Sequence, residues 1–398
     1  MLEILINKED DKKDIALLED GRLLEYYMEE ENSNRNEGNI YVGVVKNVIK
    51  GMQAAFVDIG TEKNSFIHLK DILDKIDEKN LENITTNNDK INISDVIKEG
   101  QRLLVQVKKD SNLQKGARVS THINLPSKYI ALMPNTDIIT VSQKIEDKKE
   151  QERLIKLVKE NLSPENGAII RTSAAGKNQE IIEDIKNVEK RWKEIQAKFE
   201  NNKASKPKLI AKANGIFEKM IIDLPEKSVQ KITLNSKEEY NNIMQFNKMN
   251  NYLSGIDIVL KENEDILDIY DVKKEVSKLE NRKIWLKCGG FITIDKTEAL
   301  TAIDVNTGKY TGNKSVEDTV FKVNKEATVE IAKQLRLRDI GGIIIIDYID
   351  MKNEKNKEEI QTLLEEKLKL DRTKTQVEGF TKLDLMELTR KHICSHKE

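Results

Sequence analysis

The stretch GGIIIIDYID, at residues 341–350, decides the fold of the region around it. Four consecutive isoleucines follow two glycines, and Asp347 comes directly after them. A short run of β-branched residues that begins after a turn signal is typical of a buried strand. Because every residue of the run is apolar, we expect a central strand over residues 341–349 with both faces covered. Asp347 then ends the apolar core of a central strand.

The segments that flank this strand predict the rest of an α/β sheet domain. Their apolar spacing indicates strands over residues 291–295 and 299–305, and helices over residues 315–335, 356–370 and 382–391. Asp304 ends the second of these strands, and Asn306 follows two residues later on the same face. Two buried strands of the chain therefore each end in an aspartate.

Asp304 and Asp347 are the best candidates for a catalytic centre. Mg²⁺ takes few carboxylate ligands when it also binds substrate phosphates, and Asn306 is suited to orient a phosphate or a water molecule. The alternative is that each aspartate only caps the turn or helix after its strand. Asp350, three residues after Asp347, fits an ordinary surface acid better than a further member of the site.

A second informative region lies before residue 110, where short strand-like runs alternate with turn residues as in a small barrel. The runs cover residues 39–49, 54–59, 65–69 and 101–108. Phe56 and Phe66 lie on neighbouring predicted strands, and His68 shares a face with Phe66. Such a platform stacks unpaired bases, while the nearby Lys108, Lys109, Lys115 and Arg118 are candidates to bind phosphates. The alternative is that the phenylalanines fill the barrel interior.

The order of the strings in this region resembles the S1 RNA-binding domain. The resemblance rests on Gly43, Gly51, AAFVD at residues 54–58, SFIH at residues 65–68, Gly100 and VQV at residues 105–107. It implies a barrel of the OB-fold type that binds RNA.

The middle of the chain predicts further α/β elements. Strand-like runs cover residues 129–133, 138–141 and 168–172, and amphipathic helices cover residues 147–161 and 180–201. In the next segment we expect strands over residues 219–223 and 231–234 and a helix over residues 236–245.

Long strings in the last third of the chain resemble the ribonuclease E/G family. They are GGF at residues 289–291, TEALTAIDVNTG at residues 297–308, QLRLRDIGGIIIIDYIDM at residues 334–351 and LTRK at residues 388–391. The resemblance covers essentially the whole chain. It implies that Asp304 and Asp347 bind Mg²⁺ and that Asn306 supports them.

The same resemblance implies a pocket that senses the 5′ end of RNA. The matching string is GAIIRTSAAGK at residues 167–177, and it puts phosphate contacts on Arg171 and Thr172. The chemistry agrees, because a guanidinium makes bidentate charge-assisted bonds to a phosphate and a threonine hydroxyl adds a donor. A surface arginine after a strand is the alternative.

The family resemblance also implies the domain organisation of this α+β multidomain chain. An S1 (OB-fold) barrel and a 5′-sensor region are inserted into an RNase H-like subdomain, and a DNase I-like catalytic domain follows. The expected segments are 1–38 for the first part of the RNase H-like subdomain, 39–127 for S1, 128–205 for the sensor, 206–281 for the rest of the RNase H-like subdomain and 282–398 for catalysis.

The cysteine content departs from the family pattern. Members commonly carry a Cys-x-x-Cys motif after the nuclease domain, through which two protomers share a zinc ion, but this chain offers only Cys394 there. His392 and His396 flank it and are alternative ligands across a dimer, but a frayed tail is the better explanation of these three residues. We therefore expect no zinc-linked dimer, while a homo-oligomer of another kind stays open.

Composition adds exclusions rather than a function. Lys and Arg number 67 against 69 for Asp and Glu, so no global positive field indicates nucleic acid and any RNA site must be local. Two cysteines cannot build a disulfide framework. The longest apolar run is far shorter than a membrane span, and the first ten residues lack a signal-peptide core. These features favour a cytoplasmic protein.

The sequence therefore predicts a Mg²⁺-dependent endoribonuclease that hydrolyses single-stranded RNA and leaves 5′-phosphate ends, and the family resemblance implies that the RNA is A/U-rich. Stimulation by a 5′-monophosphate, and a role in ribosomal RNA maturation or messenger RNA decay, follow from the resemblance. The alternative is a non-catalytic S1-domain RNA-binding factor, which predicts loss of a metal-binding carboxylate. A DNA-directed nuclease is disfavoured, because a stacking platform and a 5′-end pocket suit single strands of RNA.

Overall fold

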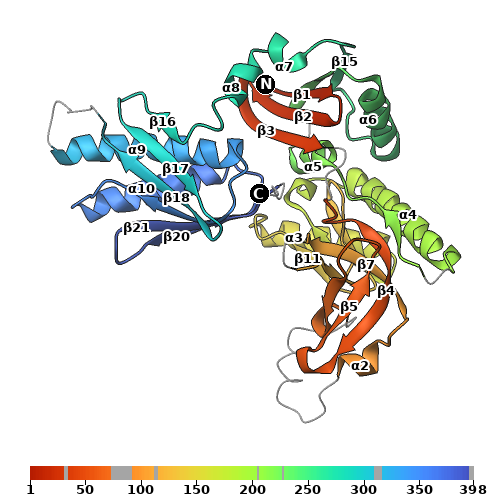
Figure 1. Cartoon of the computed structure of the whole chain (residues 1–398). Helices are drawn as coiled ribbons and strands as arrows, with labels where there is room; N and C mark the ends of the chain where they lie inside the picture. The colour runs from red at the N-terminus through yellow and green to blue at the C-terminus, as the bar shows by residue number, and fades with distance from the viewer. Residues whose placement is uncertain are drawn as a thin grey trace. The chain divides into compact units, whose positions relative to one another are not determined.

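The computed structural model describes residues 1–30, 35–72, 92–111, 115–203, 206–225, 228–308 and 316–393. The chain divides into two compact units (Figure 1). One consists of Met1–Asn32, Glu226–Met244 and Leu253–Glu398, and the other of Ser33–Pro225 and Gln245–Tyr252. None of the helices in the described ranges combines the length and the apolarity that a membrane crossing requires.

A six-stranded sheet carries the candidate acidic site of the first unit. Its strand order is β16 (Lys283–Trp285), β17 (Phe291–Lys296), β18 (Leu300–Asn306), β19 (Gly342–Asp347), β21 (Leu385–Arg390) and β20 (Thr375–Phe380). Only β18 and β19 pair in parallel. The helices α9 (Val316–Leu337) and α10 (Glu354–Leu368) pack on one face, where Ile303 and Ile346 join their apolar side chains in one core (Figure 1).

The prediction that both faces of the isoleucine strand are covered is wrong. Ile344 and Ile346 are fully buried under the helices, whereas Ile343 is 52% exposed. The reason is that α9 and α10 lie on the same side of the sheet, so none of the helices described in this unit covers the opposite face of β19. An all-isoleucine run carries no alternation that reveals which face is covered.

Two further predicted elements are also wrong. Residues 382–391 were expected as a helix, but Leu385–Arg390 forms β21, in which Met386 and Leu388 are buried and Glu387 is exposed. This alternation of buried and exposed residues suits a strand, and β21 pairs with β19. A local sequence pattern does not reveal this distant partner. Residues 219–223 were expected as a strand but belong to helix α5 (Ile216–Asp223), whose apolar face docks into the protein interior.

The first unit contains a second sheet, formed by segments far apart in sequence. Its order is β15 (Asp257–Leu260), β14 (Val229–Leu234), β1 (Leu2–Glu9), β2 (Lys12–Glu19) and β3 (Arg22–Glu30). The first strand of the chain, β1, pairs in parallel with β14, which lies more than 200 residues later in the sequence. The sheet therefore joins the amino-terminal segment to a distant part of the chain. The helices α6 (Lys237–Asn250), α7 (Ile266–Ile269) and α8 (Val272–Val276) follow its last strands.

The second unit contains a closed five-stranded barrel. The strands β4 (Ile40–Ile49), β5 (Ala54–Asp58), β6 (Ser65–His68), β8 (Arg118–Ser120) and β7 (Arg102–Lys109) pair in that order, and β7 returns to β4. A short helix, α2 (Ile93–Val96), precedes β7. The strand β13 (Lys208–Ala211) pairs with β4 in antiparallel orientation. A Cβ on Gly43 would lie 2.5 Å from Val57 Cγ1, so a side chain at this position of β4 would collide with β5.

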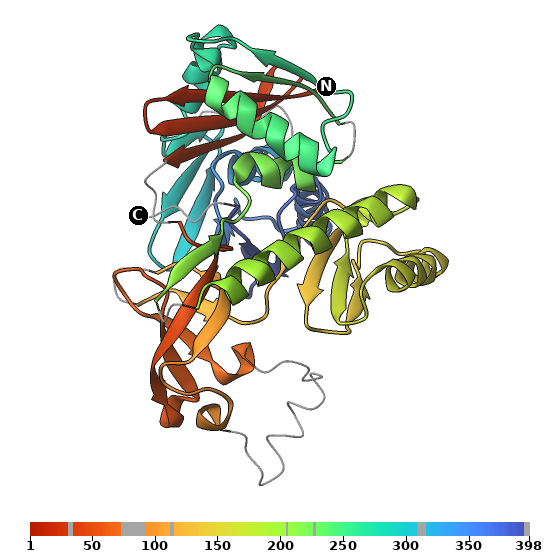
Figure 2. The same ribbon diagram turned by 90° about the vertical axis from the view of Figure 1, so that its right-hand side faces the viewer.

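A four-stranded sheet completes the second unit. Its order is β11 (Ile139–Val141), β12 (Asn166–Ile170), β10 (Ile130–Pro134) and β9 (Leu125–Pro126), with helices α3 (Lys148–Asn161) and α4 (Gln179–Asn201). Figure 2 shows the long α4 running past these strands, and its apolar stripe shares their core. Asp184 of α4 is buried there and accepts hydrogen bonds from Ser127 Oγ at 2.5 Å and Tyr129 N at 2.9 Å. Burial raises the pKa of this carboxyl group.

Candidate active site and RNA-binding surface

The sheet register brings Asp304 and Asp347 together. Asp304 near the end of β18 is the direct parallel partner of Asp347 at the end of β19. Neighbouring strands lie about 4.8 Å apart, and both side chains are exposed, so the two carboxylates share the open face of the sheet. The predicted juxtaposition of two strand-ending aspartates is thus present in the structure.

The two carboxylates repel each other electrostatically. The pKa of Asp347 is raised, first by burial and then by the negative charges of Asp304 and Asp350. Asn306 Nδ2 donates a hydrogen bond to Asp304 Oδ2 at 2.6 Å, which fixes the orientation of that carboxylate. A divalent cation between the acids removes the repulsion, so the donor set fits Mg²⁺. No cluster of three or more His, Cys, Asp or Glu side chains suited to a metal occurs within the described ranges.

Helix α9 holds the segment that follows Asp347, through residues that sequence reasoning missed. Asn324 is fully buried, donates to Ile349 O at 2.8 Å and accepts from Ile349 N at 3.2 Å. The hydroxyl groups of Thr328 and Tyr348 lie 2.9 Å apart. The available signal was the i, i+4 spacing of Asn324 and Thr328, two polar residues within the otherwise apolar stripe of a helix.

The aromatic platform of the barrel lies on its outside. Phe56 and Phe66 are direct cross-strand partners with ring centroids 6.0 Å apart, and the rings of Phe66 and His68 are 4.6 Å apart. All three side chains are partly exposed, whereas Ala55, Val57 and Ile67 fill the interior. The alternative in which the phenylalanines form the barrel core is therefore excluded.

Lys115 is exposed close to this platform. It precedes Gly116, where an added Cβ would lie 1.9 Å from Asn64 O, so this turn passes tightly against the start of β6. Arg118, the register partner of Phe66, is engaged in an ion pair with Asp71 at 2.9 Å. Lys108 Nζ donates to Gln106 Oε1 at 2.8 Å, and burial lowers the pKa of Lys108 to about 8.

Arg171 and Thr172 lie just after β12, as expected, but both have protein partners. The guanidinium of Arg171 forms an ion pair with Asp223 and donates to Ser127 O at 3.3 Å. Thr172 starts a 3₁₀ turn, and its hydroxyl lies 3.1 Å from Ser142 Oγ. A terminal phosphate at this position has to compete with the Asp223 carboxylate.

The carboxyl-terminal tail gives little information about zinc. His392 Nδ1 lies 3.0 Å from Asp339 O. Cys394 and His396 lie outside the described residues, so the structure does not test the predicted absence of a zinc link.

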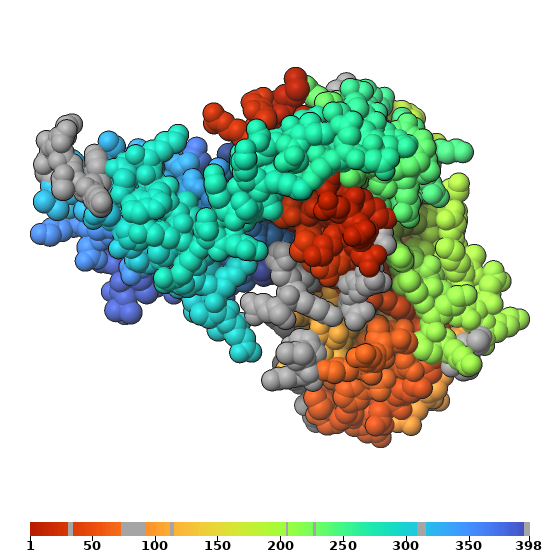
Figure 3. Space-filling view, turned by 45° about the horizontal axis from the view of Figure 1, so that its top comes forward, coloured from red at the N-terminus to blue at the C-terminus, as the bar shows by residue number. Residues whose placement is uncertain are grey.

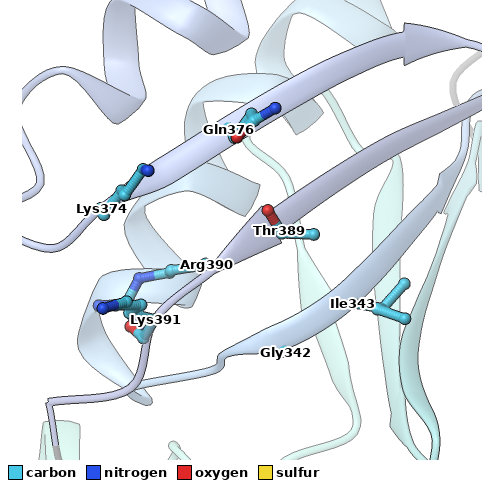
Figure 4. Close-up of a pocket in the computed structure, with 7 residues that line it drawn as sticks. All are labelled: Gly342, Ile343, Lys374, Gln376, Thr389, Arg390 and Lys391. Atoms are coloured by element: carbon cyan, nitrogen blue, oxygen red, sulfur yellow. The ribbon is translucent and has the colours of Figure 1, made fainter. Parts of the chain in front are cut away.

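One open pocket lies on the six-stranded sheet, at the end opposite to the aspartates. It has a volume of about 380 Å³ and is lined by Gly342, Ile343, Lys374, Gln376, Thr389, Arg390 and Lys391 (Figure 4). Gly342 begins β19 and Asp347 ends it. The pocket is therefore separate from the acidic pair.

An RNA-binding type of barrel and a sheet with paired acids define a nuclease-like multidomain protein, and comparisons with known proteins identify its family. The model described as "Ribonuclease E/G family" matches residues 124–393, and "S1 RNA binding domain" matches residues 35–121. The first match covers more than half of the chain. The chain therefore belongs to the ribonuclease E/G family.

Curated relatives support the same assignment over almost the full length. The chain is 38% identical over 401 residues to Ribonuclease G of Salmonella typhimurium (strain SL1344), covering 98% of this chain and 79% of that protein. It is 37% identical over 399 residues to Ribonuclease G of Escherichia coli (strain K12), with the same coverage. Ribonuclease E of a Nostoc species is 33% identical over 362 residues, covering 89% of this chain and 51% of that protein. The prediction of an endoribonuclease with an S1 domain is confirmed.

Proposed function

We propose that the chain cleaves single-stranded, A/U-rich RNA by Mg²⁺-dependent hydrolysis at Asp304 and Asp347. The observation that carries this proposal is the direct pairing of the two aspartates on the open face of the sheet, at the carboxyl ends of β18 and β19. Family membership gives the reaction class, and the acids give it a location. A binding factor without catalysis has no need of two mutually repelling carboxylates held in register.

Each residue of the site has a separate task in this proposal. Asp304 and Asp347 supply the oxygen ligands for Mg²⁺, and the hydrogen bond from Asn306 keeps the Asp304 carboxylate oriented. When bound, Mg²⁺ supplies positive charge that offsets the charge of the scissile phosphate and promotes ionisation of water. The hydrogen bonds between Asn324 and Ile349 keep the chain after Asp347 in place. Cleavage leaves a 5′-phosphate on the downstream product.

The remaining segments bind the substrate in our proposal. Within residues 39–127, Phe56, Phe66 and His68 stack bases and Lys115 contacts a phosphate. In the sensor region, residues 128–205, Arg171 and Thr172 bind a 5′-monophosphate and accelerate cleavage. Residues 1–38 and 206–281 supply the RNase H-like support in this proposal, through the five-stranded sheet of β1, β2, β3, β14 and β15, whereas β13 and α5 of the same range belong to the second unit. Residues 282–398 form the DNase I-like catalytic domain.

The first experiment measures cleavage of a short A/U-rich RNA with Mg²⁺ or with EDTA. We expect cutting only with Mg²⁺, and a loss of at least about a hundredfold for Asp304→Asn and for Asp347→Asn. The matched control is Glu358→Gln, which removes an exposed carboxylate from α10. RNA binding without any cutting by the wild-type protein would establish the non-catalytic alternative.

A second experiment tests 5′-end sensing on RNAs that carry a 5′-monophosphate or a 5′-hydroxyl group. We expect wild-type protein to cut the monophosphorylated RNA faster, and Arg171→Gln to abolish that difference without lowering the rate on the hydroxyl form. Lys149→Gln, which removes an exposed cation from α3, serves as the control. An unchanged preference in Arg171→Gln would remove Arg171 from the sensor. The biological role that we propose is maturation of ribosomal RNA or decay of messenger RNA.

A further inference from the structure

An aromatic cluster lies on the open face of the six-stranded sheet. The rings of Trp285 on β16 and Phe291 on β17 meet edge to face, with centroids 5.3 Å apart. Trp285 is 59% exposed. Lys283 Nζ lies 3.5 Å from the Phe291 ring centroid and 4.2 Å from that of Trp285. The cluster thus combines a large exposed π surface with a positive charge.

The strand register places this cluster beside the acidic pair. Trp285 pairs with Phe291, and Phe291 pairs with Asn306, so these three residues form one row across β16, β17 and β18. Asp304 and Asp347 lie in the next row on the same face of the sheet. Two strand spacings, about 10 Å, therefore separate Trp285 from Asn306. Figure 1 shows the three strands side by side, and Figure 3 shows the chain around β16 and β17, in teal, on the molecular surface.

Packing of the protein itself does not account for Trp285. The opposite face of these strands supplies the core, through residues such as Ile292 and Ile303, which are at most 1% exposed. The second tryptophan, Trp192, shows the usual pattern and is 4% exposed within the core of α4. An exposed indole beside a site for a phosphodiester is instead suited to a ligand with a flat apolar face and an attached negative charge.

We propose that Trp285, supported by Phe291 and Lys283, stacks on an unpaired base that flanks the scissile phosphate. This inference rests on the proposed cleavage at Asp304 and Asp347. The base stacks on the indole, and the Lys283 ammonium group neutralises a neighbouring phosphate. Because a paired base does not present its face to a protein side chain, the contact restricts cleavage to single strands at the catalytic sheet itself. It also orients the strand independently of the barrel platform.

Tryptophan fluorescence tests the contact without requiring activity. The chain has two tryptophans, so Trp192 is the sole other source of the signal. In an Asp347→Asn background with EDTA, we expect single-stranded RNA, but not an RNA duplex, to quench the emission. The quenching disappears in Trp285→Phe, while fluorescence anisotropy shows that this variant still binds the RNA. Quenching that persists in Trp285→Phe, or bound RNA that quenches nothing in the Asp347→Asn protein, overturns the proposal.

Steady-state cleavage provides the second test. We expect Trp285→Ala to lower kcat/KM about fivefold to 150-fold, and Trp285→Phe to recover most of the loss because it restores an aromatic face. Leu383→Ala, at a residue that is 81% exposed in a turn of the same domain, is the control for loss of an apolar side chain. On an RNA with an abasic site next to the cleavage position, we expect the wild-type and Trp285→Ala proteins to have equal kcat/KM.

The two proposals fail in different ways. If the wild-type protein cuts RNA and Trp285→Ala cuts the intact substrate equally well, the stacking contact is refuted while the catalytic assignment stands. If the wild-type protein cuts nothing, the catalytic assignment is refuted, and the fluorescence experiment still decides whether Trp285 contacts a base.

Discussion

The barrel and the six-stranded sheet differ in whether their first and last strands pair with each other. The barrel closes through the pairing of β4 with β7, whereas the sheet stays open and covers only one face with α9 and α10. Both expose candidate site residues on one side of their strands. In the barrel that side carries the rings of Phe56 and Phe66, and in the sheet it carries the paired carboxylates. The closed barrel thus exposes aromatic rings on its outer wall, while the open sheet exposes two carboxylates at the ends of neighbouring strands.

The largest expected effect tests what holds the open sheet together. The Arg390 side chain is fully buried and forms ion pairs with Asp371 at 2.7 Å and Asp339 at 2.8 Å. Arg390→Ala removes the buried cation that bridges these two buried carboxylates, so we expect a loss of about 3–5 kcal/mol in the free energy of unfolding. Urea denaturation measures the loss, and hydrogen exchange locates it.

The comparison predicts that this loss stays local. Amides of β19 and β21 should exchange faster in Arg390→Ala, while those of the barrel keep their protection. Lys391→Ala, at an exposed neighbour, should change neither. Equal loss of protection in both regions would show that the barrel depends on the sheet for its stability.

The second effect separates chemistry from binding. Asp347→Asn should lower cleavage at least about a hundredfold, which corresponds to about 2.7 kcal/mol, because it removes a proposed metal ligand. The affinity for single-stranded RNA, measured by anisotropy with EDTA, should stay within about twofold of wild type, because the barrel surface is unchanged. A parallel loss of affinity would mean that the acidic site also contributes to RNA binding without metal.

The third effect is the converse change on the barrel. Phe66→Ala removes the central ring of the platform and should weaken RNA binding by about 1–3 kcal/mol. At saturating RNA, kcat should remain unchanged. Met52→Ala, at a residue of the barrel that is 56% exposed, is the control. Unaltered binding in Phe66→Ala would assign the grip on RNA to other surfaces.

The smallest expected effect is a pH dependence of the stability of the barrel. Burial lowers the pKa of Lys108 to about 8 from a usual value of 10.5, so the folded state holds this proton less tightly than the unfolded state does. Stability therefore increases as pH rises from about 8 towards 10.5, by about 1–2 kcal/mol once partial exposure is discounted. Urea midpoints across this range should show the gain in wild-type protein. Lys108→Met should lack it, and an identical gain in both proteins would point to other groups.

Local patterns predicted the elements whose environment is simple. Helix α4 has one apolar stripe, and the barrel strands alternate between interior and surface, so each carries its own period in the sequence. The helix prediction for residues 382–391 is wrong because the alternation in β21 spans only six residues, and the charged composition of the segment also suits a helix. Partner strands decided the outcome, since β21 lies between β19 and β20.

The candidate site shows the same division. The strings around Asp304 and Asp347 gave the family and its endoribonuclease activity, and strand ends predicted that the two acids meet. Sequence reasoning missed Asn324, because its partner is the backbone of Ile349 on a different element. Sequence reasoning also missed the ion pair between Asp223 and the guanidinium of Arg171, because 52 residues separate the two in the chain.

The sequence by itself determined the chemical groups, the family and most of the periodic elements, because motif order and apolar period are properties of neighbouring residues. Tertiary structure decided which face of the isoleucine strand is covered, which carboxylates share a register, and where Trp285 lies relative to them. The physical reason is that strand pairing and helix placement join residues far apart in the chain. Their energies depend on partners that no local pattern names.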